Sequence, residues 1–178
     1  MRKVTLAFGL IAGALISVFL FIGFVVWENS RKIIDNELIG FATMIIALSM
    51  VFFGIKSYRD NYQKGAIRFW KGFQVGMLIT LIASLMYAIT WETYLQTRPA
   101  SYHAFVDYYI ECQINKKKEK GASAVEIDEE VKRGDYIKRI YRNPATRFGW
   151  TLMEILPVGI IIALISAAVL RKKEFLPA

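Results

Sequence analysis

The sequence predicts an all-α membrane protein, an antiparallel bundle of four transmembrane helices with an extracytoplasmic helical hairpin between spans three and four. Composition is the first observation, because 55% hydrophobic residues and a mean hydropathy of +0.36 over 178 residues exceed what a soluble domain carries. Segmentation is the second, since four windows of roughly 20 residues hold almost no charge and are separated by clusters of Lys and Arg. The whole chain, residues 1–178, is therefore predicted to form a single integral membrane domain.

The predicted spans are residues 4–26, 38–55, 73–92 and 148–170, each close to the length that crosses a bilayer as a helix. Arg2 and Lys3 precede the first span, and a basic start before an apolar run also marks secretory signal peptides. This run exceeds the roughly 7 to 15 residues of a signal peptide's apolar core, so we expect it to remain as a transmembrane helix.

The basic residues predict the orientation, because short loops rich in Lys and Arg stay in the cytoplasm. Four crossings place three basic clusters on one side, so both termini are expected to be cytoplasmic and residues 98–147 extracytoplasmic. The net charge of +8 follows from this topology, and no nucleic-acid partner is predicted. The three clusters are Arg2 and Lys3; Lys56, Arg59, Lys64, Arg68 and Lys71; and Arg171, Lys172 and Lys173.

Residues 98–147 have the composition of amphipathic helices rather than of a simple connection. At about 50 residues the segment is longer than two spans need, so it is either the binding part of the protein or only a long connection. In its first half, apolar residues recur with the spacing of one helical face: Tyr102, Phe105, Val106, Tyr109 and Ile110.

Capping signals divide this segment into two helices. Ser101 is expected to cap the first helix, and Gly121 follows its end. Ser123 and Glu126 have the spacing of a capping box that starts the second helix. Asn143 is followed by a proline, which predicts the start of the fourth span's helix.

Small residues recur at every fourth position of the third span, where a neighbouring helix can approach closely. Shorter sets occur in the first span, at Gly9, Gly13 and Ser17, and in the fourth, at Gly159, Ala163 and Ala167. They predict a compact bundle, although the same surface could build a homo-oligomer. The seam of the third span consists of Gly72, Gly76, Thr80, Ser84 and Ala88.

Two carboxylates, Glu92 and Glu154, lie near the outer ends of the third and fourth spans. A hydrocarbon core of about 30 Å, counted at about 1.5 Å per residue, places Glu92 at the outer boundary and Glu154 about a turn deeper. If the two helices are neighbours, the pair could form a proton or cation site inside the membrane. Alternatively, each acid bonds a nearby cation or hydroxyl: Arg147, Arg98, Thr93 or Thr151.

The basic link between the second and third spans mixes cations with aromatic residues. Its cations are candidate contacts for anionic lipid headgroups, or they only keep this loop on the cytoplasmic side of the membrane. They are Lys56, Arg59, Lys64, Arg68 and Lys71.

Metal and cysteine chemistry have weak signals. His103 and Asp107 have the spacing of two ligands, but a third would have to come from Glu92, Glu111 or Glu154, so no metal site is predicted. The single cysteine, Cys112, is expected to be buried rather than paired between chains.

Several motifs together resemble a known family: GIKSYRD from Gly54, KGFQVGMLITLIAS from Lys71, TWETY, and MEILPVGIIIALISAAVLRKK from Met153. In this combination the chain resembles domain-of-unknown-function family 4199, small four-span membrane proteins of Gram-negative bacteria. The resemblance implies a multi-pass protein of the bacterial inner membrane and transfers no catalytic residues.

We therefore expect a non-enzymatic component that binds or organises something in the inner membrane or envelope, with the hairpin contacting an envelope protein. The alternative is a small oligomeric transporter or ion-coupled component that uses Glu154 and Glu92. The middle of the spans holds only isolated Thr and Ser, which favours binding over transport. No G-x-S-x-G, HExxH, paired CxxC or phosphate loop occurs, so neither an enzyme nor a cofactor is predicted.

Overall fold

The computed structural model describes residues 1–30 and 37–172, apart from the side chains of residues 30, 37–39 and 102. Residues 31–36 of the first loop and Lys173 of the last basic cluster lie outside that part. Within it the secondary structure is helical, with one isolated bridge between Ile67 and Lys172, so the all-α prediction is confirmed. The helices are α1 (Arg2–Ser30), α2 (Glu37–Tyr62), α3 (Phe69–Thr97), α4 (Pro99–Glu119), α5 (Ala124–Arg142) and α6 (Pro144–Leu170).

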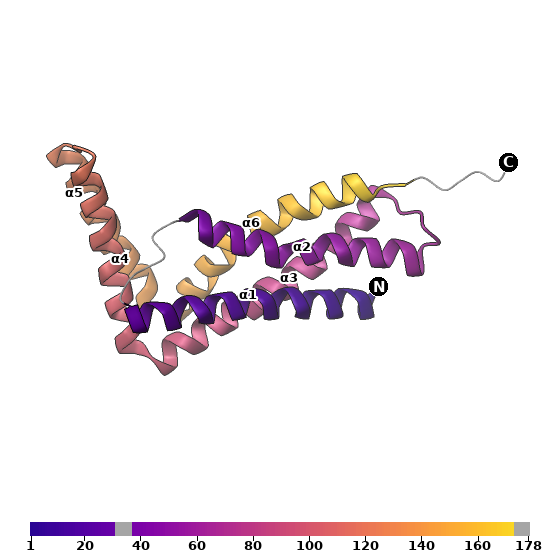
Figure 1. Cartoon of the computed structure of the whole chain (residues 1–178), viewed down its shortest axis with the longest axis horizontal. Helices are drawn as coiled ribbons and strands as arrows, with labels where there is room; N and C mark the ends of the chain where they lie inside the picture. Colours follow the sequence, from indigo (N-terminus) through magenta and orange to yellow (C-terminus); the bar gives the residue numbers. More distant parts are fainter. Residues whose placement is uncertain (31–36, 173–178) are drawn as a thin grey trace.

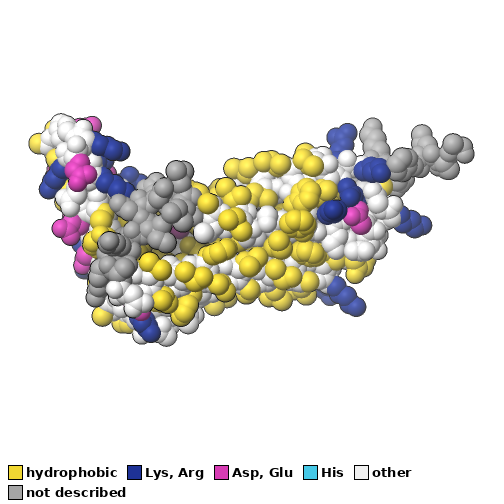
Figure 2. Space-filling view, viewed as in Figure 1, with side chains coloured by type: hydrophobic (Ala, Val, Ile, Leu, Met, Phe, Trp, Pro, Cys, Tyr) yellow, Lys and Arg dark blue, Asp and Glu magenta, His cyan; other side chains and the backbone are white. Residues whose placement is uncertain are grey.

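Four of the helices, α1, α2, α3 and α6, are long and apolar enough to cross a membrane. They run along the long axis of the molecule, and the start of α1 and the end of α6 lie at the same end (Figure 1). Hydrophobic side chains cover the visible side of this bundle, and charged side chains gather at its two ends (Figure 2). This distribution is the one that a hydrocarbon layer around the middle of the bundle requires.

The α1–α3 interface is built on small residues of α1, with the two helices parallel. A Cβ atom added at Gly9 would lie 2.7 Å from Cβ of Ile82, and one at Gly13 would lie 2.8 Å from Cβ of Met86. One turn further along, the hydroxyls of Ser17 and Thr90 are hydrogen-bonded at 2.9 Å. The backbones can approach this closely only because the α1 positions carry little or no side chain.

The α3–α6 interface is antiparallel and contains the small-residue seam of α3. Gly72 and Gly76 lie against Ala167 and Ala163 of α6, and Thr80 lies against Gly159. All five seam residues, Gly72, Gly76, Thr80, Ser84 and Ala88, are buried inside the chain. The seam is therefore used for packing within one molecule.

Segment 98–147 forms α4 and α5, which lie side by side across one end of the bundle (Figure 1). Two ion pairs join them, Lys117 with Glu130 at 2.9 Å and Lys138 with Asp107 at 2.7 Å. Ile110 of α4 packs against Gly134 of α5. A Cβ atom added at Gly134 would lie only 2.6 Å from Cγ2 of Ile110, so this contact requires a glycine.

The expected capping box of α5 is present, since Ser123 accepts from the Glu126 amide while the Glu126 carboxylate accepts from Ser123. The Ser123 amide and hydroxyl both donate to the Glu126 carboxylate and hold its pKa below the ordinary value. Gly121 follows α4 with a positive φ of 75°, and Asn143 caps α6, as predicted. The start of α4 was predicted wrongly, because the helix begins at Pro99 without a side-chain cap and Ser101 lies inside its first turn.

Candidate functional site

Glu92 is bonded to Arg147, and this pair ties the outer end of α3 to the start of α6. Arg147 Nε donates to one carboxylate oxygen of Glu92 at 2.8 Å, and its Nη2 donates to the other. The remaining Nη1 donates to the carbonyl of Tyr141 in the last turn of α5 at 2.8 Å. One guanidinium therefore holds three helices together, which only a planar group with several fixed donors can do.

Glu154 does not join this pair. It lies seven residues beyond Arg147 on α6, or about 10 Å along the helix at about 1.5 Å per residue. Its neighbours are aromatic: Trp150 lies one turn before it on α6, and Tyr87 of α3 lies within reach of its charge. The two carboxylates named by sequence thus have different surroundings, and Glu154 is the one that borders an open space.

That space is a cleft of about 740 Å³ between α3, α4, α5 and the first half of α6, which we call the outer cleft. Seven of the twelve described residues that line it are aromatic. Trp150 and Met153 of α6 are exposed at its edge, Met153 by 71%, on a helix apolar enough to cross a membrane. The outer cleft is therefore reachable from the side of the bundle that lipid would cover.

The charges in the outer cleft come from two different walls. Among the described residues that line it, Glu154 of α6 is the one acid and Arg133 of α5 is the one permanent cation. Predicted face residues Phe105, Val106 and Tyr109 of α4 also line the cleft, whereas the side chain of Tyr102 lies outside the described residues. An apolar site with one acid and one base can bind an amphiphile that carries both charges.

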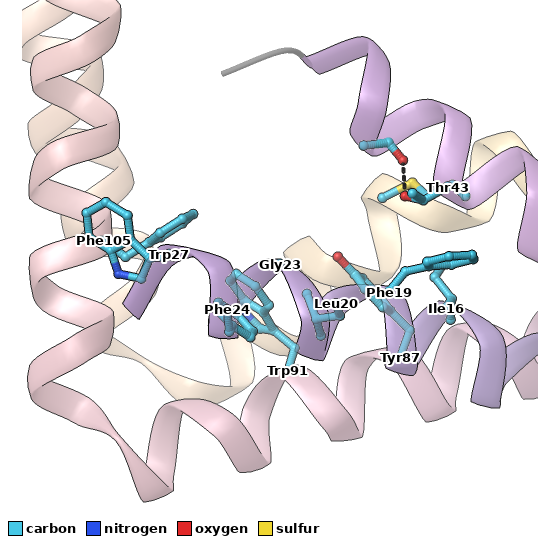
Figure 3. Close-up of a pocket in the computed structure, with 12 residues that line it drawn as sticks. Ile16, Phe19, Leu20, Gly23, Phe24, Trp27, Thr43, Tyr87, Trp91 and Phe105 are labelled. Carbon is cyan, nitrogen blue, oxygen red and sulfur yellow. Dashed lines mark hydrogen bonds between the residues drawn. The ribbon is translucent and has the colours of Figure 1, made fainter. Parts of the chain in front are cut away.

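A second, smaller hollow of about 230 Å³ lies between α1, α2, α3 and α4 (Figure 3). Three aromatic residues, Tyr87, Trp91 and Phe105, line both hollows. The remaining walls are almost entirely apolar, with Thr43 bonded to the backbone carbonyl of Gly40 at 2.8 Å. An apolar hollow thus lies directly beside the charged cleft.

Aromatic stacking makes the end of the bundle rigid where α4 begins. Phe24 of α1 stacks on Tyr94 of α3 with ring centroids 3.6 Å apart, and Trp27 contacts Phe105 of α4 at 5.5 Å. Glu28 accepts from Tyr94 at 3.2 Å and pairs with Arg98. These contacts fix α4 against the bundle, so the walls of both hollows are held by packed side chains.

The remaining candidates lie elsewhere. Asp107, one of the two residues with metal-ligand spacing, forms an ion pair with Lys138. In the described part of the chain, no group of three His, Cys, Asp or Glu residues could hold a metal. Cys112 is half-buried on α4. Of the five basic residues in the link between α2 and α3, Arg68 and Lys71 line a separate cleft at the opposite end of the bundle, and Arg59 pairs with Asp60 at 2.7 Å.

Sequence reasoning missed the contribution of α5 to the outer cleft. Arg133, Tyr136, Ile137 and Tyr141 recur at positions i, i+3, i+4 and i+8, the spacing of one helical face. The signal was available, but a face that mixes one arginine with two tyrosines does not stand out in a search for apolar residues.

These features define a class of protein: a helical membrane protein with four candidate spans and a pair of helices lying across one end. The sequence model of the family described as protein of unknown function (DUF4199) matches residues 7–172, so the chain belongs to that family. No curated protein and no solved structure matches the chain.

Proposed function

We propose that this protein is a non-enzymatic binding component of the bacterial inner membrane, and that the outer cleft binds a phospholipid with an amine in its headgroup. The observation that carries the proposal is that one carboxylate, Glu154, and one guanidinium, Arg133, line a cleft whose other described residues are aromatic or apolar. An ammonium group fits beside Glu154, and a phosphate fits beside Arg133.

The aromatic lining supports the amine. Ammonium groups bind over the faces of Trp and Tyr, with an attraction of about 0.5–2 kcal/mol that is largest where water is excluded. Tyr87 and Trp150 lie near Glu154, and Trp91 lines the same cleft. The acyl chains would lie along the exposed apolar surface of α6 and in the smaller hollow.

Retention of lipid by the purified protein tests this proposal. We expect Glu154→Gln and Arg133→Gln each to lower retention of phosphatidylethanolamine about tenfold, since a charge-assisted hydrogen bond contributes about 1.5–3 kcal/mol. Glu129→Gln and Arg139→Gln are matched controls, because both residues are exposed on α5 and neither lines the cleft. Native mass spectrometry of the protein in nanodiscs measures retention, and equal losses in all four variants would contradict the proposal.

The orientation is part of the same proposal. The basic clusters support cytoplasmic termini, which places α4, α5 and the outer cleft on the periplasmic side. In a Cys112→Ser background, a membrane-impermeant maleimide should label Glu119→Cys in intact spheroplasts, and Gln63→Cys only after permeabilisation. Both positions are exposed, at opposite ends of the molecule. The reverse pattern would show that the orientation is inverted.

The alternative of an ion-coupled transporter is less well supported. Glu92 is held by two bonds from Arg147, so a proton or cation site would have to use Glu154 without it. If a proton-dependent phenotype exists and Glu154→Gln abolishes it while phosphatidylethanolamine retention is unchanged, the transport function replaces the binding function.

A further inference from the structure

A second cleft, of about 850 Å³, lies at the end of the bundle opposite the outer cleft, and we call it the basic cleft. The link between α2 and α3 forms one wall, and the end of α6 forms the other. A short antiparallel bridge joins the walls, since the Ile67 amide donates to the Lys172 carbonyl and the Lys172 amide to the Ile67 carbonyl, both at 3.1 Å. Two segments about 100 residues apart in sequence are thus fixed beside each other.

The basic cleft concentrates positive charge. Nine described residues line it, of which four are cations, Arg68 and Lys71 from the start of α3 and Arg171 and Lys172 after α6, and none is an acid. Asp60 of α2 interacts with the charge of Lys172 and pairs with Arg59. The four cations therefore bring their charges to one space between the two walls.

The position of the basic cleft indicates which ligand suits its cations. Each pair of cations flanks the end of a helix that is apolar enough to cross a membrane, so the cleft lies at headgroup level. Trp70, between Arg68 and Lys71, is 70% exposed, which is typical of an aromatic residue at a lipid interface.

From this geometry we propose that the basic cleft binds the phosphate of one anionic phospholipid in the leaflet at the end of the bundle where α1 begins and α6 ends. Arg68 and Arg171 donate to the phosphate oxygens from opposite walls, as guanidinium groups do to phosphates. Lys71 and Lys172 add charge, and Trp70 lies beside the glycerol region. The site differs from the sequence prediction, because it recruits the two cations after α6 and leaves out Lys56, Arg59 and Lys64.

The test compares two double variants that remove the same charge at the same end of the molecule. In nanodiscs that mix phosphatidylglycerol with phosphatidylcholine, Arg68→Gln/Arg171→Gln should lower phosphatidylglycerol retention about tenfold, measured by native mass spectrometry. Lys56→Gln/Lys64→Gln should retain the lipid like the unaltered protein, since neither residue lines the cleft. Equal loss in both variants would mean a diffuse surface charge and would overturn the proposal.

Three further measurements test whether charge alone is needed, whether free phosphate is the ligand, and whether the outer cleft is affected. Arg68→Lys/Arg171→Lys should recover most of the retention, and its failure to do so while the protein remains folded would contradict binding through charge. Inorganic phosphate in excess should not displace the lipid, whereas full displacement would assign the cleft to free phosphate instead. Phosphatidylethanolamine retention by the outer cleft should be unchanged in Arg68→Gln/Arg171→Gln. The proposals for the two clefts can therefore be tested independently.

Discussion

At the scale of single residues, the ion pair of Glu92 and Arg147 decides how α3, α5 and α6 meet. The side chains are 10% and 17% exposed for Arg147 and Glu92 respectively, so water screens the pair only weakly. Burying two charges costs desolvation energy, which the two direct bonds and the bond to the Tyr141 carbonyl offset.

Removing only one partner should therefore be more damaging than removing both. We expect Glu92→Ala to lower the free energy of unfolding by about 3 kcal/mol, because it leaves a buried guanidinium without a counter-charge. Glu92→Ala/Arg147→Met should recover a large part of that loss. Asp128→Ala, which breaks the exposed pair with Lys132, should cost less than about 1 kcal/mol.

Thermal unfolding in detergent measures these differences. If the double variant is no more stable than Glu92→Ala, the pair does not act through its buried charge, and the account of how α5 is tied to the bundle is wrong.

At the scale of elements, the helix interfaces depend on the absence of side chains at a few positions. A Cβ atom added at Gly159 would lie 2.1 Å from Cγ2 of Thr80 and 3.1 Å from its Cβ. Thr80 is itself fully buried, and its hydroxyl hydrogen-bonds with the Gly159 carbonyl at 3.5 Å. Because β-branched side chains have few rotamers, the contact can be relieved only by moving the helices apart.

Gly159→Ala should therefore destabilise the bundle by about 1–3 kcal/mol. The control is on the same helix: Gly149→Ala meets nothing within 4 Å and should be neutral or stabilising by up to about 1 kcal/mol. Chemical denaturation followed by circular dichroism compares the two variants. An equal effect of both substitutions would show that helix propensity rather than the α3–α6 contact explains any change.

At the scale of the whole molecule, sequence predicted the bundle better than the site. Long apolar runs can be stable only as spans, and caps such as Ser123 with Glu126 are local, so both follow from short stretches of sequence. The partner of Glu92 depended on the register of α3 against α6, which no short stretch determines. Arg147 was among several candidates, and only the packed helices select it.

The two clefts illustrate the same limit. The outer cleft joins α3, α4, α5 and α6, and the basic cleft joins residues 68 and 171, so neither is a motif that can be seen along the chain. Charge counting found Arg68 and Lys71 because they are neighbours in sequence. Arg171 and Lys172 were counted only as an orientation signal, because sequence does not show that they lie beside the α2–α3 link. The bridge between Ile67 and Lys172 brings them there.

The central claim is that the outer cleft holds an amine-bearing phospholipid, and photo-crosslinking in native membranes tests it most directly. A benzophenone amino acid at Tyr109 lies in the cleft, and the same probe at Val125, 69% exposed on α5, does not. We predict a phosphatidylethanolamine adduct at position 109 and none at position 125, identified by mass spectrometry of the crosslinked protein. An adduct to another protein or to a second copy of the chain at position 109, with no lipid adduct there, would contradict the claim.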